Sequence, residues 1–182
     1  PGAGNVPPAV QALLDARPPR NVFRMMAHAP ALMPGIMELT GAVLYRAKLD
    51  PIFRELVILR VGHLCRSTYE VSQHRKIARA IGLSQEKIDG TSRDADPKLY
   101  AGSELLVLRM TEQVVRKVKA DDELFAATLA ALGNELTMEL LLVIGLYVML
   151  AQVLENAEVG LEEGGGPAQQ DVQELFSSQA KK

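Results

Sequence analysis

Residues 50–83 read DPIFRELVILRVGHLCRSTYEVSQHRKIARAIGL, and this stretch decides the fold. Asp50 followed by Pro51 is a strong helix start, because Asp accepts hydrogen bonds from the free amides and Pro fits the first turn. The apolar run that follows predicts a buried helix over 52–65, and a second helix is predicted over 69–81. Two helices joined by so short a turn usually pack as neighbours.

The rest of the chain is typical of the same fold class. Ser67 or Thr68 is expected to cap the helix over 69–81, and Gly82 to end it. No segment alternates as a strand does, and the sequence predicts an all-α single domain at 20–161 between flexible segments at 1–19 and 162–182. Three further helices are predicted before residue 50: one at 9–16, one at 22–27 with Asn21 as its cap, and one from about Pro30 with Leu32 and Leu39 on its apolar face. Four more are predicted after residue 83: one from Ser84 to Asp89, one at 99–119 with Val118 on its apolar face, one at 123–132, and one at 135–161. A break at Gly133-Asn134 separates the last two.

Composition and charge exclude several function classes. The chain has 182 residues, a size that suits one domain, with 48% hydrophobic and 4% aromatic residues and no Trp. Its formal net charge is −2, so we expect neither nucleic acid nor a membrane as a partner. The single Cys excludes an internal disulfide and a two-cysteine redox pair. The opening residues have no signal-like pattern, and we expect a cytoplasmic protein.

Residues 140–151 are the most apolar stretch, with 12 residues and no charge. A membrane-spanning helix needs about 20 apolar residues, so this run is too short by itself. It is hydrophobic around its whole circumference, which indicates a helix buried in a core or in a subunit interface. We therefore expect a homo-oligomer.

Three ionisable residues interrupt apolar faces. His74 shares an apolar stripe with Ile77, and Glu70 lies on that stripe one turn earlier. Glu55 interrupts the apolar helix before it, and Gly62, two turns on, leaves space beside its carboxylate. Glu55, Glu70 and His74 could line one pocket, where burial would favour the neutral form of one carboxyl. This is a plausible acid–base group.

Structural interpretations of the same residues remain open. A Glu–His pair one turn apart is common on helix surfaces, and the structural alternative for Glu55 is an ion pair with Arg54 or Arg60. Cys65 is expected to be a core residue, since the carboxyl end of a helix disfavours a thiolate. No metal site is expected, because Glu70 and His74 supply only two ligands.

Four segments carry a resemblance to a known family: RELVILRV at 54–61, STYE at 67–70, His74, and ARAIGLS at 78–84. They resemble the carboxymuconolactone decarboxylase family, which also contains the alkyl hydroperoxidase D proteins. The resemblance extends over residues 20–161. It implies an all-helical, alkyl hydroperoxidase D-like bundle that assembles as a trimer or hexamer.

The peroxidase members of that family carry Cys-x-x-Cys, with a His four residues after the second Cys and a Glu 12 residues before the first. His74 and Glu55 match these positions, but Ser67 and Glu70 stand where the two cysteines would be. Cys65 lies two residues too early to replace either. Peroxidase turnover needs an attacking and a resolving thiol, so this chemistry is not carried over.

The decarboxylase-like members keep acidic and imidazole groups in this region. The resemblance therefore implies a cofactor-free enzyme that acts on a small carboxylated lactone or a related acid. Glu55, Glu70 and His74 are the expected catalytic groups, and Ser67 and Tyr69 the expected substrate-binding hydroxyls. Two alternatives are a peroxidase that uses Cys65 as its single thiol and a non-catalytic oligomer that binds a small acid.

Overall fold

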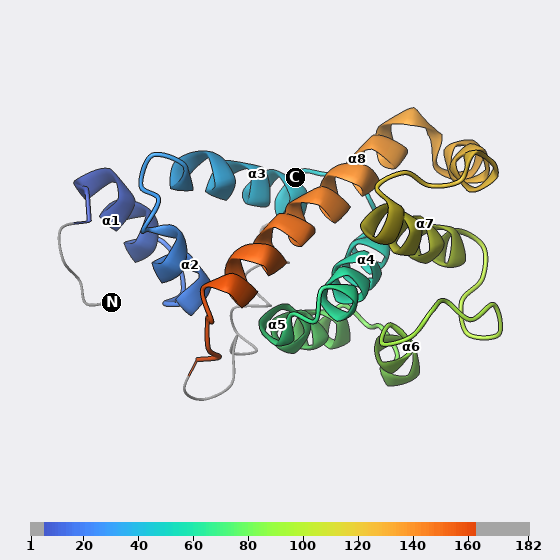
Figure 1. Ribbon diagram of the computed structural model, residues 1–182, viewed down its shortest axis with the longest axis horizontal. Helices are drawn as coiled ribbons and strands as arrows, with labels where there is room; N and C mark the ends of the chain where they lie inside the picture. The colour runs from blue at the N-terminus through green and yellow to red at the C-terminus, as the bar shows by residue number, and fades with distance from the viewer. Residues whose placement is uncertain (1–5, 163–182) are drawn as a thin grey trace. The chain divides into compact units, whose positions relative to one another are not determined.

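The computed structural model describes residues 6–162, and all regular secondary structure in that range is helical. The predicted all-α class is confirmed, with the arrangement of helices shown in Figure 1. The segments predicted to be flexible at 1–19 and 162–182 lie partly outside the described residues. The eight helices are α1 (Pro8–Asp15), α2 (Asn21–Met26), α3 (Met33–Tyr45), α4 (Pro51–Leu64), α5 (Thr68–Ala80), α6 (Gln85–Gly90), α7 (Ser103–Lys117) and α8 (Asp122–Asn156).

The chain divides into two compact units. One comprises residues 1–46 and 156–182 and holds α1, α2 and α3; the other comprises residues 47–155 and holds α4 to α8. In the first unit, the backbone N–H of Asn21 donates to the Glu162 carboxylate, and the side-chain amide of Asn21 donates to the Gly160 carbonyl. These two bonds hold the segment after α8 against the start of α2. The domain limits of 20–161 stay a prediction.

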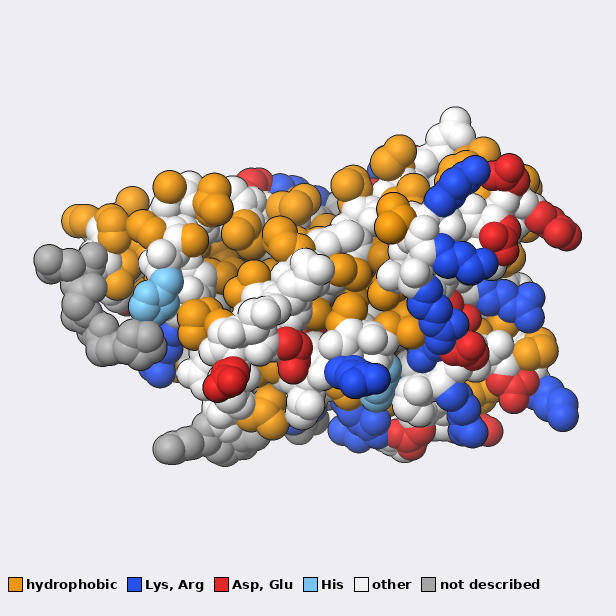
Figure 2. Space-filling view, viewed as in Figure 1, with side chains coloured by type: hydrophobic (Ala, Val, Ile, Leu, Met, Phe, Trp, Pro, Cys, Tyr) orange, Lys and Arg blue, Asp and Glu red, His pale blue; other side chains and the backbone are white. Residues whose placement is uncertain are grey.

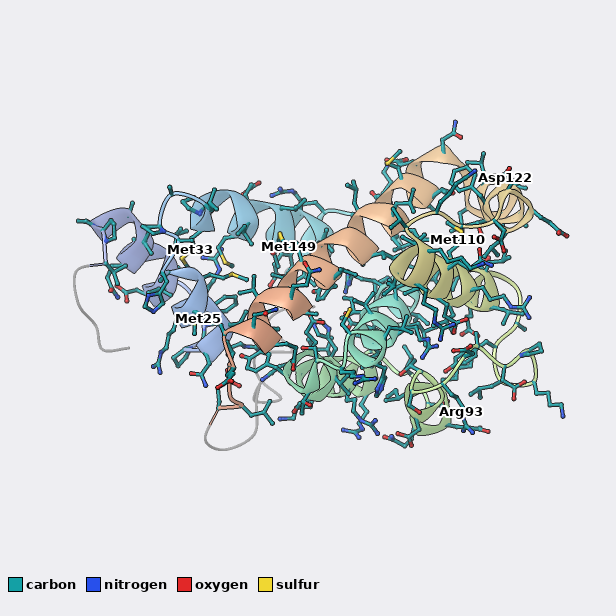
Figure 3. All side chains as sticks on the ribbon, viewed as in Figure 1. Met25, Met33, Arg93, Met110, Asp122 and Met149 are labelled. Atoms are coloured by element: carbon teal, nitrogen blue, oxygen red, sulfur yellow. The ribbon has the colours of Figure 1, made fainter. Side chains whose placement is uncertain are left out.

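The second unit is built around α4, which contacts both α5 and α7 (Figure 1). Every residue of α4 from Arg54 to Gly62 is buried, which explains why its sequence has almost no polar face. Asp50 accepts a hydrogen bond from the amide of Ile52 at 2.7 Å, so the predicted start of this helix is confirmed. Met110, labelled in Figure 3, lies on the face of α7 that is fully buried.

One hydrophobic cluster ties α4 to α5, α6 and α7. It extends from α4 across the start of α6 to the segment before α7, where the buried Tyr100 hydroxyl donates to the Lys87 carbonyl at 2.5 Å. This cluster fixes α4 and α5, the two helices that carry the candidate site. Its buried members are Leu56, Leu59, Ala78, Leu83, Ile88, Tyr100 and Leu108.

Several predicted helix limits are wrong. Asn21 is the first residue of α2 and does not cap it, since Arg20 stands at the cap position without a side-chain bond. Leu32 precedes α3 and is 65% exposed, and Leu39 is 42% exposed, because α3 buries its methionines instead. Val118 ends α7 in a left-handed conformation and is exposed.

The limits of the two last helices also differ from the prediction. The amides of Leu99 and Tyr100 donate to Asp96, which forms a local turn, and α7 begins only after Gly102, where φ is +54°. The predicted break at Gly133 is a kink inside α8, with φ of +77°. α8 ends at Asn156 rather than at 161.

α8 is the described helix whose length and composition would allow it to cross a membrane. An 18-residue window of it has a mean hydropathy of 2.0, and 44% of that window is buried inside the protein. The length argument from residues 140–151 was wrong, because the apolar helix continues beyond the uncharged run. Core helices of soluble proteins pass the same test, so the absence of a membrane partner stays a prediction.

Candidate functional site

Glu55 and His74 meet across the contact between α4 and α5. Glu55 is fully buried in the middle of α4, and His74 is buried on the inward stripe of α5. The Nδ1 atom of His74 lies 2.7 Å from one carboxylate oxygen of Glu55, within hydrogen-bond distance. The two residues that the sequence singled out are therefore direct partners.

Arg54 approaches the other oxygen of Glu55, with its Nε atom 3.4 Å away. The arginine is itself buried, at 3% exposure, so the charge of Glu55 has partners on both sides. The predicted ion pair with Arg54 is present beside the His74 contact. Arg60, the other proposed partner, binds Glu112 and Asp94 instead.

Tyr147 of α8 contributes an aromatic wall. Its ring meets the imidazole of His74 edge to face, with 5.1 Å between ring centroids and an interplanar angle of 86°. This contact fixes the plane of the imidazole, while Glu55 fixes its Nδ1 side. Tyr147 is 3% exposed, so the aromatic side of the histidine is kept from water.

Glu70 has a different environment from Glu55. It is buried one turn before His74, and neither of its carboxyl oxygens has a hydrogen-bond partner. Burial raises the pKa of Glu70 to about 8, and the negative charge of Glu155 on α8 adds to the effect. The expected neutral carboxyl is therefore Glu70. The structural alternative, a Glu70–His74 pair, is not present: both oxygens of Glu70 lack a partner, and the Nδ1 atom of His74 contacts Glu55.

Ser67 stands at the cap position of α5 but makes no capping hydrogen bond. Its side chain is fully buried, and its Oγ atom has no partner. The predicted side-chain cap is therefore wrong, and the exposed Thr68, as the first residue of α5, does not cap it either. Tyr69 is also buried.

The absence of a side chain at Gly62 allows α4 and α5 to pack closely. A Cβ atom on Gly62 would lie 3.0 Å from Val71 and 3.5 Å from the Cβ of Glu70. The space that the sequence predicted beside Glu55 is thus occupied by α5. The glycine allows Glu70 to approach α4 closely.

Cys65 ends α4 and is half-buried. Burial raises the pKa of its thiol, and the charge of Glu70 raises it further. Both effects oppose the thiolate that a peroxidase needs. The prediction that Cys65 is a core residue is wrong, since the residue stands at the cap position after α4 and is only half-buried.

The remaining histidines belong to other segments of the chain. His63 is in the last turn of α4, where burial, followed by the charges of Arg75 and Arg60, lowers its pKa. His28 is exposed in a turn after α2. Within residues 6–162 no three His, Cys, Asp or Glu side chains are placed to hold a metal ion.

Gln73 is a buried polar residue of α5 that the sequence analysis did not single out. It is 4% exposed. Its helical spacing from Tyr69 and Ile77, both buried, is a signal that could have placed it inward.

Part of the chain matches a known protein family. Residues 30–113, slightly less than half of the chain, match the model of the carboxymuconolactone decarboxylase family. A search of curated proteins found no match.

A crystal structure described as an alkylhydroperoxidase AhpD core, an uncharacterised peroxidase-related protein from Ralstonia eutropha JMP134, has a similar fold. Its TM-score is 0.70 at 15% sequence identity, and the match covers 88% of this chain and 92% of that one.

Proposed function

We propose that the chain is a decarboxylase-type enzyme of the carboxymuconolactone decarboxylase and alkylhydroperoxidase D-like superfamily, which the family match over residues 30–113 supports. Its substrate is a small carboxylated lactone or a related acid, and it needs no cofactor. Glu55 and His74 transfer the proton, with Glu70 as the third catalytic group.

The buried contact between Glu55 and His74 carries this proposal. A carboxylate and an imidazole 2.7 Å apart, shielded by Tyr147, are suited to moving a proton at a fixed position. Since Glu55 occupies Nδ1, Nε2 is the nitrogen that gives a proton to the substrate. Arg54 balances the charge of Glu55 and supports the pair from the other side.

The reaction is a replacement of CO2 by a proton. The bond between the carboxylate and its carbon breaks, and the electron pair moves through the conjugated system to the lactone carbonyl oxygen. His74 then protonates the carbon and regains a proton from solvent.

The alternative peroxidase reaction gains no support from this site. Cys65 is the single thiol of the chain, and its pKa is raised rather than lowered. Ser67 and Glu70 stand where the paired cysteines of the peroxidase members would be, and neither can form a disulfide. Thiol titration with peroxide tests this directly, and a sulfenic acid on Cys65 would support the peroxidase.

The test of the decarboxylase is CO2 release from 4-carboxymuconolactone and its analogues. We expect His74→Gln and Glu55→Gln to lower kcat about 100-fold or more, in the range that general acid–base groups supply. His28→Gln is the matched control, because it changes an exposed histidine in the other compact unit.

Two outcomes would contradict the proposal. One is a His74→Gln protein as active as the wild type. The other is a set of carboxylated lactones that raise the melting temperature but release no CO2, which indicates a protein that binds small acids without catalysis.

A further inference from the structure

We propose that Ser67 and Glu70 form an oxyanion site, in which both side chains donate hydrogen bonds to a substrate carbonyl oxygen as it becomes an enolate. This inference rests on the proposed function, since loss of CO2 places negative charge on that oxygen. It assigns the substrate to carbonyl compounds that react through an enolate. It also gives Ser67 and Glu70 a role different from that of the Glu55–His74 pair.

The first evidence is a capping motif that does not cap. Ser67-x-x-Glu70 has the pattern in which the Ser oxygen accepts from the Glu amide and the Glu side chain accepts from the Ser amide. Neither bond forms. The amide of Ser67 donates instead to the carbonyl of Gly62 at 2.8 Å, so the donor that Glu70 would otherwise cap is already used.

The second evidence is burial without partners. Ser67 is 0% and Glu70 is 3% exposed, and all three of their side-chain oxygens lack a hydrogen-bond partner. Leaving a buried polar atom unpaired is costly, and such atoms in a folded protein call for a specific reason. Ser67 stands at the cap position of α5 and Glu70 lies in its first turn, and both adjoin Gly62: the Ser67 amide donates to the Gly62 carbonyl, and a Cβ atom on Gly62 would lie 3.5 Å from the Cβ of Glu70.

The third evidence is that both side chains can act as donors near neutral pH. With a pKa of about 8, Glu70 is protonated there and presents an O–H, as Ser67 always does. The charged or titratable groups that act on Glu70 are Glu155 from α8 and Cys65 at the end of α4. A buried neutral carboxylic acid that donates to an oxyanion is a known catalytic device.

The position of Ser67 and Glu70 at the amino end of α5 also favours the binding of negative charge. The first-turn amides of α5 have no acceptor within the helix, and the amino end of a helix dipole attracts negative charge. Donors fixed before the reaction stabilise the charge without having to reorganise. Ser67 and Glu70 keep their own protons throughout, while His74 supplies the proton that the carbon receives.

Binding of 4-nitrophenol tests the site without turnover, because its phenol and phenolate differ in colour. We expect the wild type to bind the phenolate form, and Ser67→Ala and Glu70→Leu to weaken that binding about tenfold or more, a loss typical of removing one hydrogen bond to a charged group. Affinity should also fall as the pH rises through 8, where Glu70 ionises. Benzoate is the second probe, because it is a carboxylate. A site that selects enolate-like oxygens should bind benzoate more weakly than 4-nitrophenolate.

Ser84→Ala is the matched control. Ser84 makes a normal cap on α6, where its Oγ accepts from the Lys87 amide at 3.3 Å. We expect Ser84→Ala to lower stability and leave 4-nitrophenol binding unchanged. Ser67→Ala should show the reverse, since it breaks no capping bond.

The outcomes separate this inference from the proposed function. Phenolate binding that depends on Ser67 and Glu70, without CO2 release from any lactone, supports the oxyanion site and contradicts the decarboxylase. CO2 release that Ser67→Ala and Glu70→Leu leave unchanged supports the decarboxylase and overturns the oxyanion site. Benzoate bound as tightly as 4-nitrophenolate overturns it too, because it indicates a general anion site.

Discussion

Glu70 links the stability of the fold to pH. Its pKa rises from an ordinary value of 4.5 to about 8 on folding, so between these values the folded state binds more protons than the unfolded state. The free energy of unfolding therefore falls as the pH rises from about 4.5 to about 8, and the contribution is level outside that window. A carboxylate whose pKa is lowered by an ion pair has the opposite slope.

We expect Glu70→Gln to remove this slope. The amide cannot ionise, so the variant should be more stable than the wild type above pH 8, by up to a few kcal/mol at about 1.4 kcal/mol per unit of pKa difference. Urea unfolding between pH 5 and pH 9, as test conditions, measures the difference. Glu112→Gln is the control, because it breaks the buried ion pair with Arg60 and should destabilise without removing the slope.

The sequence predicted the residues of the site better than their pairing. Helical spacing placed Glu55, Glu70 and His74 inward, because each helix repeats its faces regularly. It could not tell which carboxylate His74 would contact, since that depends on the register between α4 and α5. Ser67 shows a second limit: its sequence pattern predicts a side-chain cap, but its Oγ atom accepts no hydrogen bond, and its amide donates to the Gly62 carbonyl.

At the scale of elements, Gly90 sets the contact between α6 and the segment before α7. A Cβ atom there would overlap the Leu99 side chain and lie 2.6 Å from the Tyr100 hydroxyl. Tyr100 is buried and holds the Lys87 carbonyl, so it has little freedom to move. Gly90 is therefore a position where close packing requires the absence of a side chain.

We expect Gly90→Ala to lower stability by about 1–3 kcal/mol, the usual cost of overpacking a core. Thermal unfolding measures this, with Gly35→Ala as the control, since a Cβ there meets no atom within 4 Å. An unchanged melting temperature for Gly90→Ala would mean that Leu99 and Tyr100 can shift freely.

Arg60 joins α4 to α7 and to the segment between α6 and α7. Its buried guanidinium donates to Glu112 at 2.9 Å, to the Thr91 carbonyl at 3.1 Å and to Asp94 at 2.5 Å. We expect Arg60→Met to destabilise by about 3–5 kcal/mol, because it leaves the Glu112 carboxylate buried without its partner. Urea unfolding of Arg60→Met and of Arg60→Met with Glu112→Met tests this, and the double variant should recover part of the loss.

The elements were predictable where their ends have local causes. Asp50 and Pro51 start α4 by a side-chain bond and a fixed backbone angle, and both act within a few residues. The start of α7 was missed because the turn at Asp96 depends on how Tyr100 is held by the core. Tertiary contacts of that kind leave no periodic signal in the sequence.

At the scale of the whole molecule, the second unit leaves part of its longest helix uncovered. The helix α8 buries residues such as Leu140, Ile144 and Leu150, yet Met138 and Leu142 are 58% and 53% exposed. These two lie one turn apart on the same face, and Figure 2 shows hydrophobic side chains at the surface of the protein. An exposed apolar stripe of this kind favours association.

We therefore predict a homo-oligomer, a trimer or a hexamer as the family resemblance implies, in which this face of α8 is covered by another copy. Burial contributes about 25 cal/mol per Å² of apolar surface, so covering several large side chains in each subunit stabilises a closed ring by many kcal/mol. Light scattering gives the mass, and a value of 19.8 kDa, that of one chain, would contradict the prediction. Leu142→Lys should shift the mass toward that value, because it places a charge on the covered face. Asn134→Lys, at an exposed polar position of the same helix, should leave the mass unchanged.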